Sequence, residues 1–162
     1  MRLFRAAALA ALLGLYLPSL GQAQLADKKV LTLAAAKQMV AAAEAEATRN
    51  GWSLVFVVVD ESANLILLER MDGVQLASLQ VAQAKARTAA LYRRPSKDFA
   101  DRLASGSTTA LVMPDVMPLD GGLPIVVDGQ VIGAMAASGA TGAQDAQAVQ
   151  AGIATLIQPP SR

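Results

Sequence analysis

Two short stretches hold most of the side chains that could bind or transform a ligand. Residues 69–73 read "ERMDG" and place Arg70 and Asp72 where a predicted strand gives way to a helix. A guanidinium at such a position can hold a carboxylate through two parallel hydrogen bonds. An ion pair between Arg70 and Asp72 that only fixes the turn is the alternative, and the spacing leaves both interpretations open.

The second stretch, residues 85–94, reads "KARTAALYRR" and is the most concentrated basic segment of the chain. On a helix, Lys85 shares a face with Thr88, and Thr88 shares a face with Tyr92. An anionic ligand would suit this segment. A helix face that is merely solvated is the competing interpretation.

The chain contains no cysteine and no histidine. The absence of cysteine excludes disulfides, zinc–thiolate sites, iron–sulfur clusters and a thiol nucleophile. The absence of histidine removes the usual general base and the commonest ligand of zinc and of haem iron. Any catalysis would therefore depend on carboxylates, lysine, tyrosine or a bound cofactor, and the residues leave it open whether the protein is an enzyme.

Residues 1–23 have the layout of a secretory signal peptide. Two arginines precede an apolar run at residues 6–17, and a small-residue cleavage site ends at Ala23. The run is shorter than the ~18–20 residues that a membrane-spanning helix needs, although an uncleaved anchor is the alternative. Cleavage would leave residues 24–162 as one periplasmic or secreted domain without a membrane span.

The charge of this domain argues against nucleic acid as a partner. Removing Arg2 and Arg5 from the 14 basic residues leaves 12, against 13 acidic ones. A nearly neutral domain lacks the basic surface that nucleic-acid binding requires.

The hydrophobic pattern predicts an α/β fold with a single antiparallel sheet and flanking helices. Four valines and a phenylalanine in residues 52–60 indicate a strand that is buried on both faces. Because hairpins make antiparallel pairs, two predicted hairpins exclude a parallel, doubly wound sheet. The predicted order is a helix at 33–49, strands at 52–60 and 65–70, a helix at 75–93, a short helix through 103, a second hairpin after 122 and a helix at 144–157.

Residues 104–120 contain a glycine and two prolines and are predicted to form a long loop with room for one short strand. Loops of this length in compact domains are often functional. Before the loop, Ser96 is a candidate N-cap for the short helix.

A glycine-rich stretch at residues 119–140 reads "LDGGLPIVVDGQVIGAMAASGA". It lacks the glycine spacings of nucleotide-binding loops, which lie between a strand and a helix. Asp128-Gly129 between apolar runs instead predicts a hairpin turn, with Gly129 at positive φ. Gly133, inside the second strand, is expected to allow close approach of another backbone or a ligand.

Three motifs, in this order, resemble the GlcG/HbpS haem-binding family: "VVD…L…ERMDG", "AKARTAALY" and "GGLPIVVDGQVIGAMAASGA". The resemblance extends over about residues 31–156. It implies a profilin-like arrangement of the sheet and helices, assembly into homo-oligomers, and binding or degradation of haem.

The resemblance also implies which residues bind a ligand. The matching positions are Arg70, Met71, Asp72 and Gly73 of "RMDG", Lys85 and Thr88 of the helix motif, and Gly121, Gly122 and Pro124 of the last motif. Without histidine, Met113 and Tyr92 become the candidate iron ligands. The first hairpin turn has Ala63-Asn64 where the family usually has glycine, and Asn64 is expected to tolerate positive φ.

Three hypotheses follow. The leading one is an exported homo-oligomer that binds haem or a related tetrapyrrole, with the anionic edge against Arg70 or Lys85 and the apolar face against residues 104–123. The second is an enzyme or accessory factor for small hydroxy- or keto-carboxylic acids, with Arg70 holding the carboxylate and Asp72 as a base. The third is an oligomeric assembly module that binds no ligand.

Overall fold

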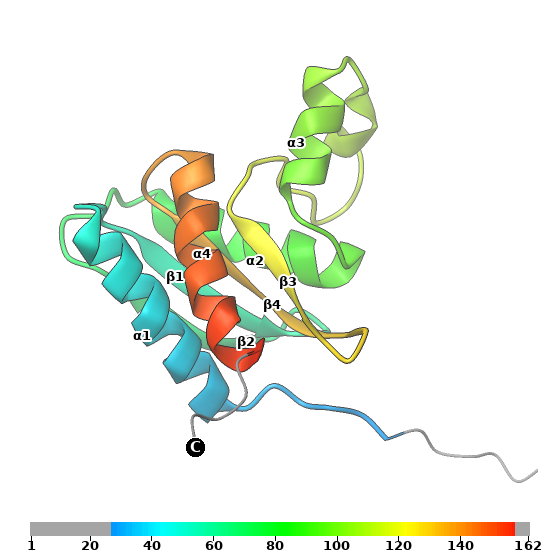
Figure 1. Ribbon diagram of the computed structural model, residues 1–162. Helices are drawn as coiled ribbons and strands as arrows, with labels where there is room; N and C mark the ends of the chain where they lie inside the picture. The colour runs from blue at the N-terminus through cyan, green and yellow to red at the C-terminus, as the bar shows by residue number, and fades with distance from the viewer. Residues whose placement is uncertain (1–26, 158–162) are drawn as a thin grey trace, which may run out of the picture.

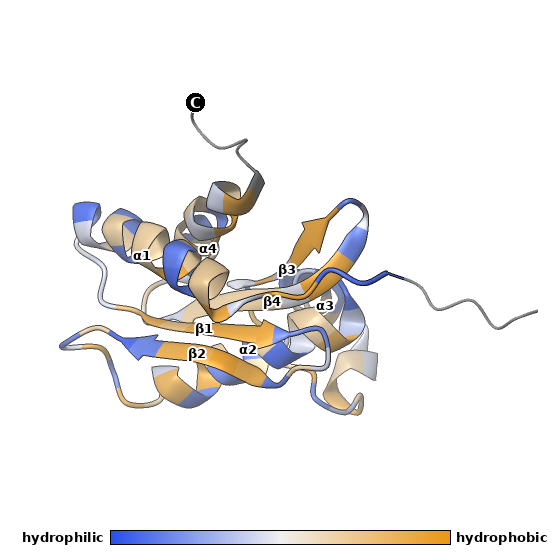
Figure 2. Ribbon diagram, turned by 90° about the horizontal axis from the view of Figure 1, so that it is seen from below, coloured by the Kyte–Doolittle hydropathy of each residue, from blue (hydrophilic) through white to orange (hydrophobic). Residues whose placement is uncertain are grey.

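One four-stranded antiparallel sheet, in the order β2-β1-β4-β3, lies between two layers of helices (Figure 1). The computed structural model describes residues 27–157, so the predicted signal peptide lies outside the described residues. Figure 2 shows α1 and α4 on one face of the sheet and α2 on the other. The elements are α1 (Leu33–Arg49), β1 (Val55–Asp60), β2 (Leu65–Arg70), α2 (Ser78–Tyr92), α3 (Lys97–Ala104), the 3-10 turn η1 (Thr108–Leu111), β3 (Gly122–Val127), β4 (Gln130–Ser138) and α4 (Gly142–Ile157).

This architecture confirms the predicted fold class. Each strand pairs antiparallel with its neighbour, and both predicted hairpins are present. None of the helices in residues 27–157 combines the length and apolarity that a membrane-spanning segment needs.

The central strand β1 is buried on both faces, as its valines predicted. Phe56 and Val58 belong to the core beneath α1 and α4. Val55, Val57 and Val59 alternate with them and belong to the core beneath α2, whose buried residues there are alanines. Because alanine is small, the helix can lie close to the sheet, and burial of these aliphatic side chains supplies most of the driving force for the fold.

The helix boundaries agree with the sequence prediction for α1 and differ for α2. The Thr32 hydroxyl accepts a hydrogen bond from Ala35 N (3.2 Å) and caps α1. α2 begins at Ser78 rather than at Gln75, because Ser78 N donates to Gln75 O and closes a turn before the helix. α2 ends one residue early, since Arg93 adopts left-handed backbone geometry (φ 53°).

The segment predicted as a long loop contains η1, so the expectation of a short strand is wrong. α3 and η1 pack mainly against one another, and Figure 1 shows α3 projecting beyond the sheet. Ser96 does precede α3, but its side chain makes no capping hydrogen bond there. Ser96 is therefore the N-cap residue of α3, as predicted, but its hydroxyl does not cap the helix.

In the first hairpin turn, which lacks the usual glycine, the residue with positive φ is not the one that was expected. Ala63, and not Asn64, takes the positive φ (64°). The Asp60 carboxylate accepts hydrogen bonds from Ser62 N (2.9 Å) and Asn64 N (2.8 Å). These bonds hold the alanine in a conformation that it disfavours by roughly 1–2 kcal/mol.

The second hairpin uses two glycines for different reasons, as the sequence predicted. Gly129 has φ 76°, and the space around its missing side chain is open. Gly133 lies in β4 against β1, where a Cβ atom would collide with the carbonyl oxygen of Val59. Gly129 is required for its backbone conformation and Gly133 for space.

We therefore expect Gly129→Ala and Gly133→Ala to differ in stability. Gly129→Ala should lower the free energy of unfolding by about 1 kcal/mol, because only backbone strain is added. Gly133→Ala should lower it by about 3 kcal/mol, because the central strand pair must move apart. Urea unfolding of the two variants measures both values, and equal losses would contradict the distinction.

Candidate functional site

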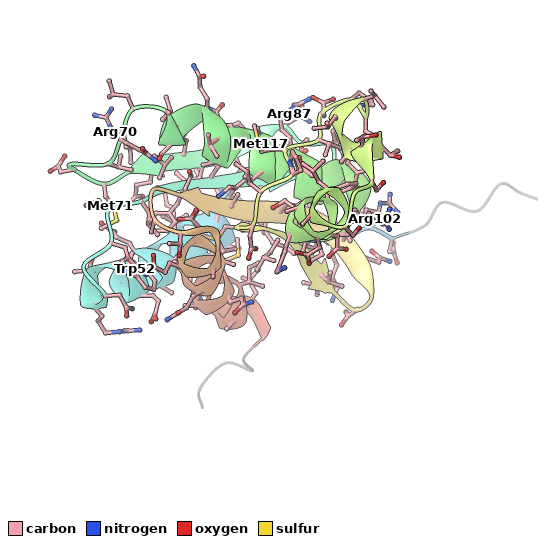
Figure 3. All side chains as sticks on the ribbon, turned by 90° about the horizontal axis from the view of Figure 1, so that it is seen from above. Trp52, Arg70, Met71, Arg87, Arg102 and Met117 are labelled. Atoms are coloured by element: carbon pink, nitrogen blue, oxygen red, sulfur yellow. The ribbon has the colours of Figure 1, made fainter. Side chains whose placement is uncertain are left out.

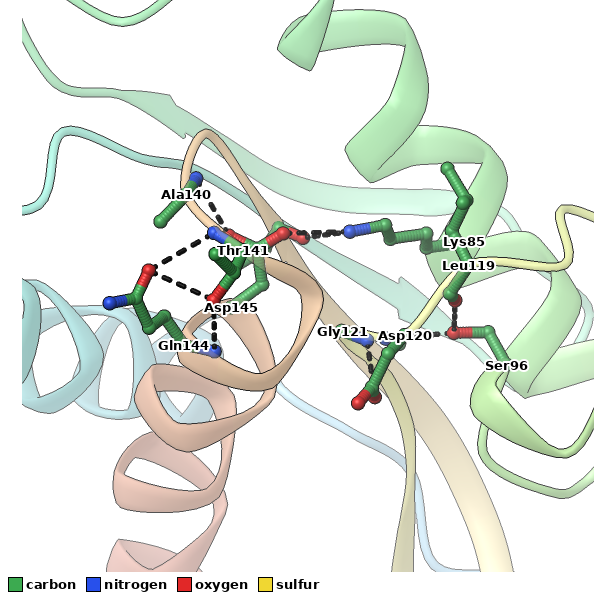
Figure 4. Close-up of polar contacts among 11 residues, drawn as sticks. Lys85, Ser96, Leu119, Asp120, Gly121, Ala140, Thr141, Gln144 and Asp145 are labelled. Carbon is green, nitrogen blue, oxygen red and sulfur yellow. Dashed lines mark hydrogen bonds and ion pairs between the residues drawn. The ribbon is translucent and has the colours of Figure 1, made fainter. Parts of the chain in front are cut away.

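A buried ion pair joins three elements beside the predicted ligand residues. Lys85, on α2, is 2% exposed and donates from Nζ to Asp145 Oδ2 (2.8 Å) and to Ala137 O (3.1 Å). Asp145, in the first turn of α4, also accepts from Ala140 N (3.1 Å). The pair thus ties α2, the end of β4 and the start of α4 together (Figure 4). The interpretation of residues 85–94 as a solvated helix face is wrong for Lys85.

The environment of the pair shifts the pKa of the Asp145 carboxyl. Burial raises its pKa above the ordinary value, while the Lys85 ammonium and the Ala140 N–H act in the opposite direction. A buried carboxylate is tolerated because its charge is matched by an ammonium and its oxygens are hydrogen-bonded.

Gly121 and Gly122 let the chain pass directly over this pair. A Cβ atom at Gly121 would lie 2.7 Å from Asp145 Cβ and 2.9 Å from Lys85 Nζ. A Cβ atom at Gly122 would lie 2.5 Å from Lys85 O and 2.9 Å from Ser96 Oγ. The structure therefore brings Lys85, Gly121 and Gly122 together, and their packing leaves no room for a side chain between them.

Ser96 also holds the segment at Gly121 and Gly122 in place, through hydrogen bonds on its other side. Its hydroxyl donates to Leu119 O (2.5 Å) and accepts from Gly122 N (3.0 Å), as Figure 4 shows. Its backbone N–H donates to Gly122 O (2.9 Å). These bonds engage the Ser96 hydroxyl, which therefore makes no capping hydrogen bond to α3.

Three residues of α2 hold residues 105–121 against the helix. The Thr88 hydroxyl accepts from Met117 N (2.8 Å) and lies 2.8 Å from the carbonyl oxygen of Asp115. Tyr92 Oη donates to Pro114 O (2.7 Å). Arg87 pairs with the Asp115 carboxylate (3.0 Å). Thr88 and Tyr92 are therefore structural anchors of the loop.

These contacts hold Pro114, Asp115 and Met117 against α2, and an apolar pair comes just before them in the chain. Leu111 is 62% exposed and Val112 is 82% exposed. The guanidinium of Arg87 pairs with Asp115, three residues after Val112, and Arg93 at the end of α2 is exposed. We call Leu111, Val112, Arg87 and Arg93 the loop surface. It combines exposed aliphatic groups with cations, which suits a flat apolar ligand that carries carboxylates.

The other predicted ligand residues lie elsewhere. Figure 3 shows Arg70 and Met71 at the far end of the molecule from Arg87 and Met117. Arg70 and Asp72 are exposed, and within residues 27–157 no ion pair joins them, so the interpretation of a turn-fixing pair is wrong. Met71 Sδ accepts a weak hydrogen bond from Leu54 N (3.4 Å).

Pro124 lies in β3 opposite Ala134 of β4 and is half-buried. The predicted residues therefore form two groups, one around Lys85 and one around Arg70. The role of each in ligand binding stays a prediction.

A groove of about 500 Å³ opens between α3 and α4. Its apolar lining comes from Pro95, Leu123, Ala143 and Ala146. Asp98 and Asp120 line it with Lys97, and Lys97 Nζ is bound to Asp101 (2.6 Å). Carboxylates thus dominate the free charge of this groove, which disfavours an anionic ligand there.

The donor atoms of the chain bear on whether it could coordinate haem iron. The hydroxyl groups of Thr88 and Tyr92 and the ammonium of Lys85 are all engaged in the internal bonds described above. Met113 and Met117 are half-buried, and their thioethers are a known type of iron ligand. Among residues 27–157 no group of three or more acidic side chains forms a metal cluster. The hydroxyl and ammonium groups are therefore engaged elsewhere, and the two thioethers stay the candidate iron ligands of this region.

Sequence reasoning missed Asp145 as a partner of the predicted site. Asp145 is 60 residues from Lys85 along the chain, so no helical or strand periodicity connects them. A single acidic residue soon after "SG" was the only signal, and nothing local showed that it would be buried.

Comparison with known proteins agrees with the motifs. A family model described as "Haem degrading protein HbpS-like" matches residues 31–154. Protein GlcG of Escherichia coli (strain K12) is 43% identical over 111 residues, which are 68% of this chain and 83% of GlcG.

Two solved structures share the fold. A double mutant of Streptomyces reticuli HbpS superposes with a TM-score of 0.74 at 33% identity, covering 82% of this chain and 90% of HbpS. A complex of PduOC with haem superposes with a TM-score of 0.72 at 26% identity, covering 78% of this chain and 94% of PduOC.

We expect Lys85→Met to lower the free energy of unfolding by about 3–5 kcal/mol at neutral pH, because Asp145 is left as an uncompensated buried charge. Without the ammonium, the folded-state pKa of Asp145 should rise further above its unfolded value. Protonation then favours the folded state, so the variant should regain stability as the pH falls through that raised pKa. Urea unfolding at neutral and mildly acidic pH measures this.

The control is the double variant Lys85→Met/Asp145→Asn, in which the amide oxygen can still accept from Ala140 N. It should recover part of the loss and show less of the pH dependence. An equal loss for Lys85→Met at all pH values would contradict the role assigned to the pair.

Proposed function

Because the chain belongs to the HbpS-like family of haem-degrading proteins, we propose that it binds haem or a related tetrapyrrole on the loop surface. The observation that carries the proposal is the exposed pair Leu111-Val112, which lies three to four residues before Asp115, the ion-pair partner of Arg87. The haem complex of the related fold of PduOC supports the ligand class.

On this proposal the residues of the loop surface have separate tasks. Leu111 and Val112 cover one face of the macrocycle and exclude water from it. Arg93, and Arg87 in competition with Asp115, hold the propionates through charge-assisted hydrogen bonds. Lys85, Asp145 and the two glycines act indirectly, since they fix the base of the loop. Bound haem would supply an iron centre that reacts with oxidants.

Export belongs to the same proposal. The pattern of basic, apolar and small residues in residues 1–23 supports secretion to the periplasm or beyond. The homo-oligomer that the family resemblance implies also stays a prediction.

The alternative of a small hydroxy- or keto-acid ligand gains no specific support. Its predicted clamp, Arg70, and its predicted base, Asp72, are exposed side chains at the end of β2. Within residues 27–157 neither side chain makes an ion pair that would orient it for catalysis.

We expect Val112→Asp to weaken haem binding by roughly 10- to 100-fold, because about 1.5–3 kcal/mol of apolar burial is lost. Leu76→Asp is the matched control: Leu76 is 81% exposed but precedes α2 at its other end, so this variant should bind like the wild type. Absorbance titration with hemin measures both.

The same titration on Arg70→Ala tests the other group of predicted residues. Unchanged binding is expected. Weakened binding for Arg70→Ala together with unchanged binding for Val112→Asp would place the ligand at the end of β2 and contradict the location proposed here. A flat, non-saturating response of the wild type would leave the ligand-free assembly module as the better hypothesis.

A second prediction concerns the iron. Since Lys85, Thr88 and Tyr92 are engaged internally, most of the binding energy should come from the macrocycle and its propionates. Metal-free protoporphyrin should therefore bind within about threefold of the affinity for hemin, a difference below 1 kcal/mol. Fluorescence quenching measures its affinity, and preference for hemin by 100-fold or more would show that iron coordination dominates.

A further inference from the structure

The groove between α3 and α4 plays no part in the haem site proposed above. Its volume of about 500 Å³ lies within the ~300–1,000 Å³ that is usual for small-molecule sites. Leu123 of β3 and Ala146 of α4 supply part of its apolar lining, and Pro95 supplies another part. The groove is therefore large enough for a short hydrocarbon chain, which its lining would shield from water.

Two acidic residues that line the groove are held in place through one serine. Asp98, in the first turn of α3, comes two residues after Ser96. Asp120 lies in the segment 119–122, which the Ser96 hydroxyl binds at both ends (2.5 and 3.0 Å), as Figure 4 shows. Asp120 also packs on the start of α4, since a Cβ atom at Gly142 would lie 2.8 Å from Asp120 Cβ. The fold therefore fixes where the two residues stand relative to each other and to α4.

The charge of the groove is negative. Within residues 27–157, neither Asp98 nor Asp120 takes part in an ion pair. Lys97 also lines the groove, but its ammonium is held by the Asp101 carboxylate (2.6 Å). The pKa of that ammonium is raised, chiefly by this hydrogen bond, with the charges of Asp120 and Asp98 contributing. Both unpaired carboxylates therefore act on the same part of the groove, which attracts a cation.

An organic cation suits this groove better than a metal ion. One oxygen of Asp120 already accepts a hydrogen bond from Gly121 N (2.7 Å). Among residues 27–157 no three acidic side chains come together as metal ligands, whereas Ca²⁺ takes about six to eight oxygen atoms. A primary ammonium needs fewer acceptors, because it donates only three hydrogen bonds, and its hydrocarbon stem can lie on apolar surface.

We propose that the groove between α3 and α4 binds an aliphatic primary amine, with its ammonium between Asp98 and Asp120 and its hydrocarbon chain along Leu123 and Ala146. The ammonium supplies the counter-charge for the two carboxylates, and the hydrocarbon chain removes apolar lining from water. This site shares no residue with the loop surface and takes a ligand of the opposite charge from haem. It therefore goes beyond the function proposed above.

Nuclear magnetic resonance titration of the ¹⁵N-labelled protein tests the proposal with three probes that share a five-carbon chain. Pentylamine should shift the backbone amide signals of Asp98, Asp120 and Gln150 in a saturable way, since all three residues line the groove. Pentanoate and 1-pentanol should bind at least about tenfold more weakly, because neither offers a cationic hydrogen-bond donor.

The length of the amine tests the apolar part of the site. A fully buried CH₂ group is worth up to about fourfold in affinity. Pentylamine, which has four more carbons than methylamine, should therefore bind at least about tenfold more tightly than methylamine. Equal affinity of the two amines would leave only attraction between charges and contradict the position given to the hydrocarbon chain.

Substitution of the carboxylates tests the charged part. Asp120→Asn should weaken pentylamine binding at least about tenfold, because the charge-assisted hydrogen bond to the ammonium is lost. Its amide oxygen can still accept from Gly121 N, so the local fold should persist. Asp98→Asn should weaken binding in the same way.

The matched control is Asp72→Asn, which removes the same charge at a distance. Asp72 directly follows Arg70 and Met71, which Figure 3 shows at the other end of the molecule from Arg102 of α3. This variant should bind pentylamine like the wild type.

The absence of a saturable shift with pentylamine, or equal binding of 1-pentanol, would overturn the proposal. Equal shifts from magnesium chloride at the same ionic strength would also overturn it, as would unchanged binding by both Asp98→Asn and Asp120→Asn. Circular dichroism and urea unfolding of each variant separate loss of binding from loss of folding. No hemin is used, so this proposal and the haem proposal can fail independently.

Discussion

The buried ion pair between Lys85 and Asp145 is the interaction on which the rest of the structure depends. It connects the helix on one face of the sheet to the helix on the other, through the end of β4. An unmatched charge at such a depth would be strongly destabilising, so each residue constrains the position of the other. The chain can close over the pair only because Gly121 and Gly122 have no side chains.

This arrangement explains why the loop after α3 has a defined shape. Arg93 and Asp115 both adopt left-handed backbone geometry (φ 53° and 56°), which costs a non-glycine residue roughly 1–2 kcal/mol. Three interactions offset this strain: the hydrogen bond that the Thr88 hydroxyl accepts from Met117 N, the bond from Tyr92 Oη to Pro114 O, and the Arg87–Asp115 pair. A rigid base therefore carries a loop whose apolar tip is turned outward, and α3 is displaced from the sheet by the same path of the chain.

Much of the fold could be predicted from the sequence, because the patterns involved are local. The bounds of α1, the double burial of β1 and the turn at Gly129 follow from side-chain periodicity and backbone preference. The family could also be recognised from its sequence motifs, and the match of the family model over residues 31–154 confirms it. Local pattern placed Ser96 correctly at the N-cap of α3 but could not show that its hydroxyl bonds to Leu119 and Gly122, which are distant in sequence.

By itself, the sequence determined the fold class, the family and the residue types available for binding, since neither histidine nor cysteine is present. Only the tertiary structure decided what those residues do. It buried Lys85 against a carboxylate 60 residues away, engaged Thr88 and Tyr92 in holding a loop, and left Arg70 exposed at a distant end of the sheet. The physical reason is that periodicity encodes which side of an element is apolar, whereas the partner of a polar group depends on which distant segment packs against it.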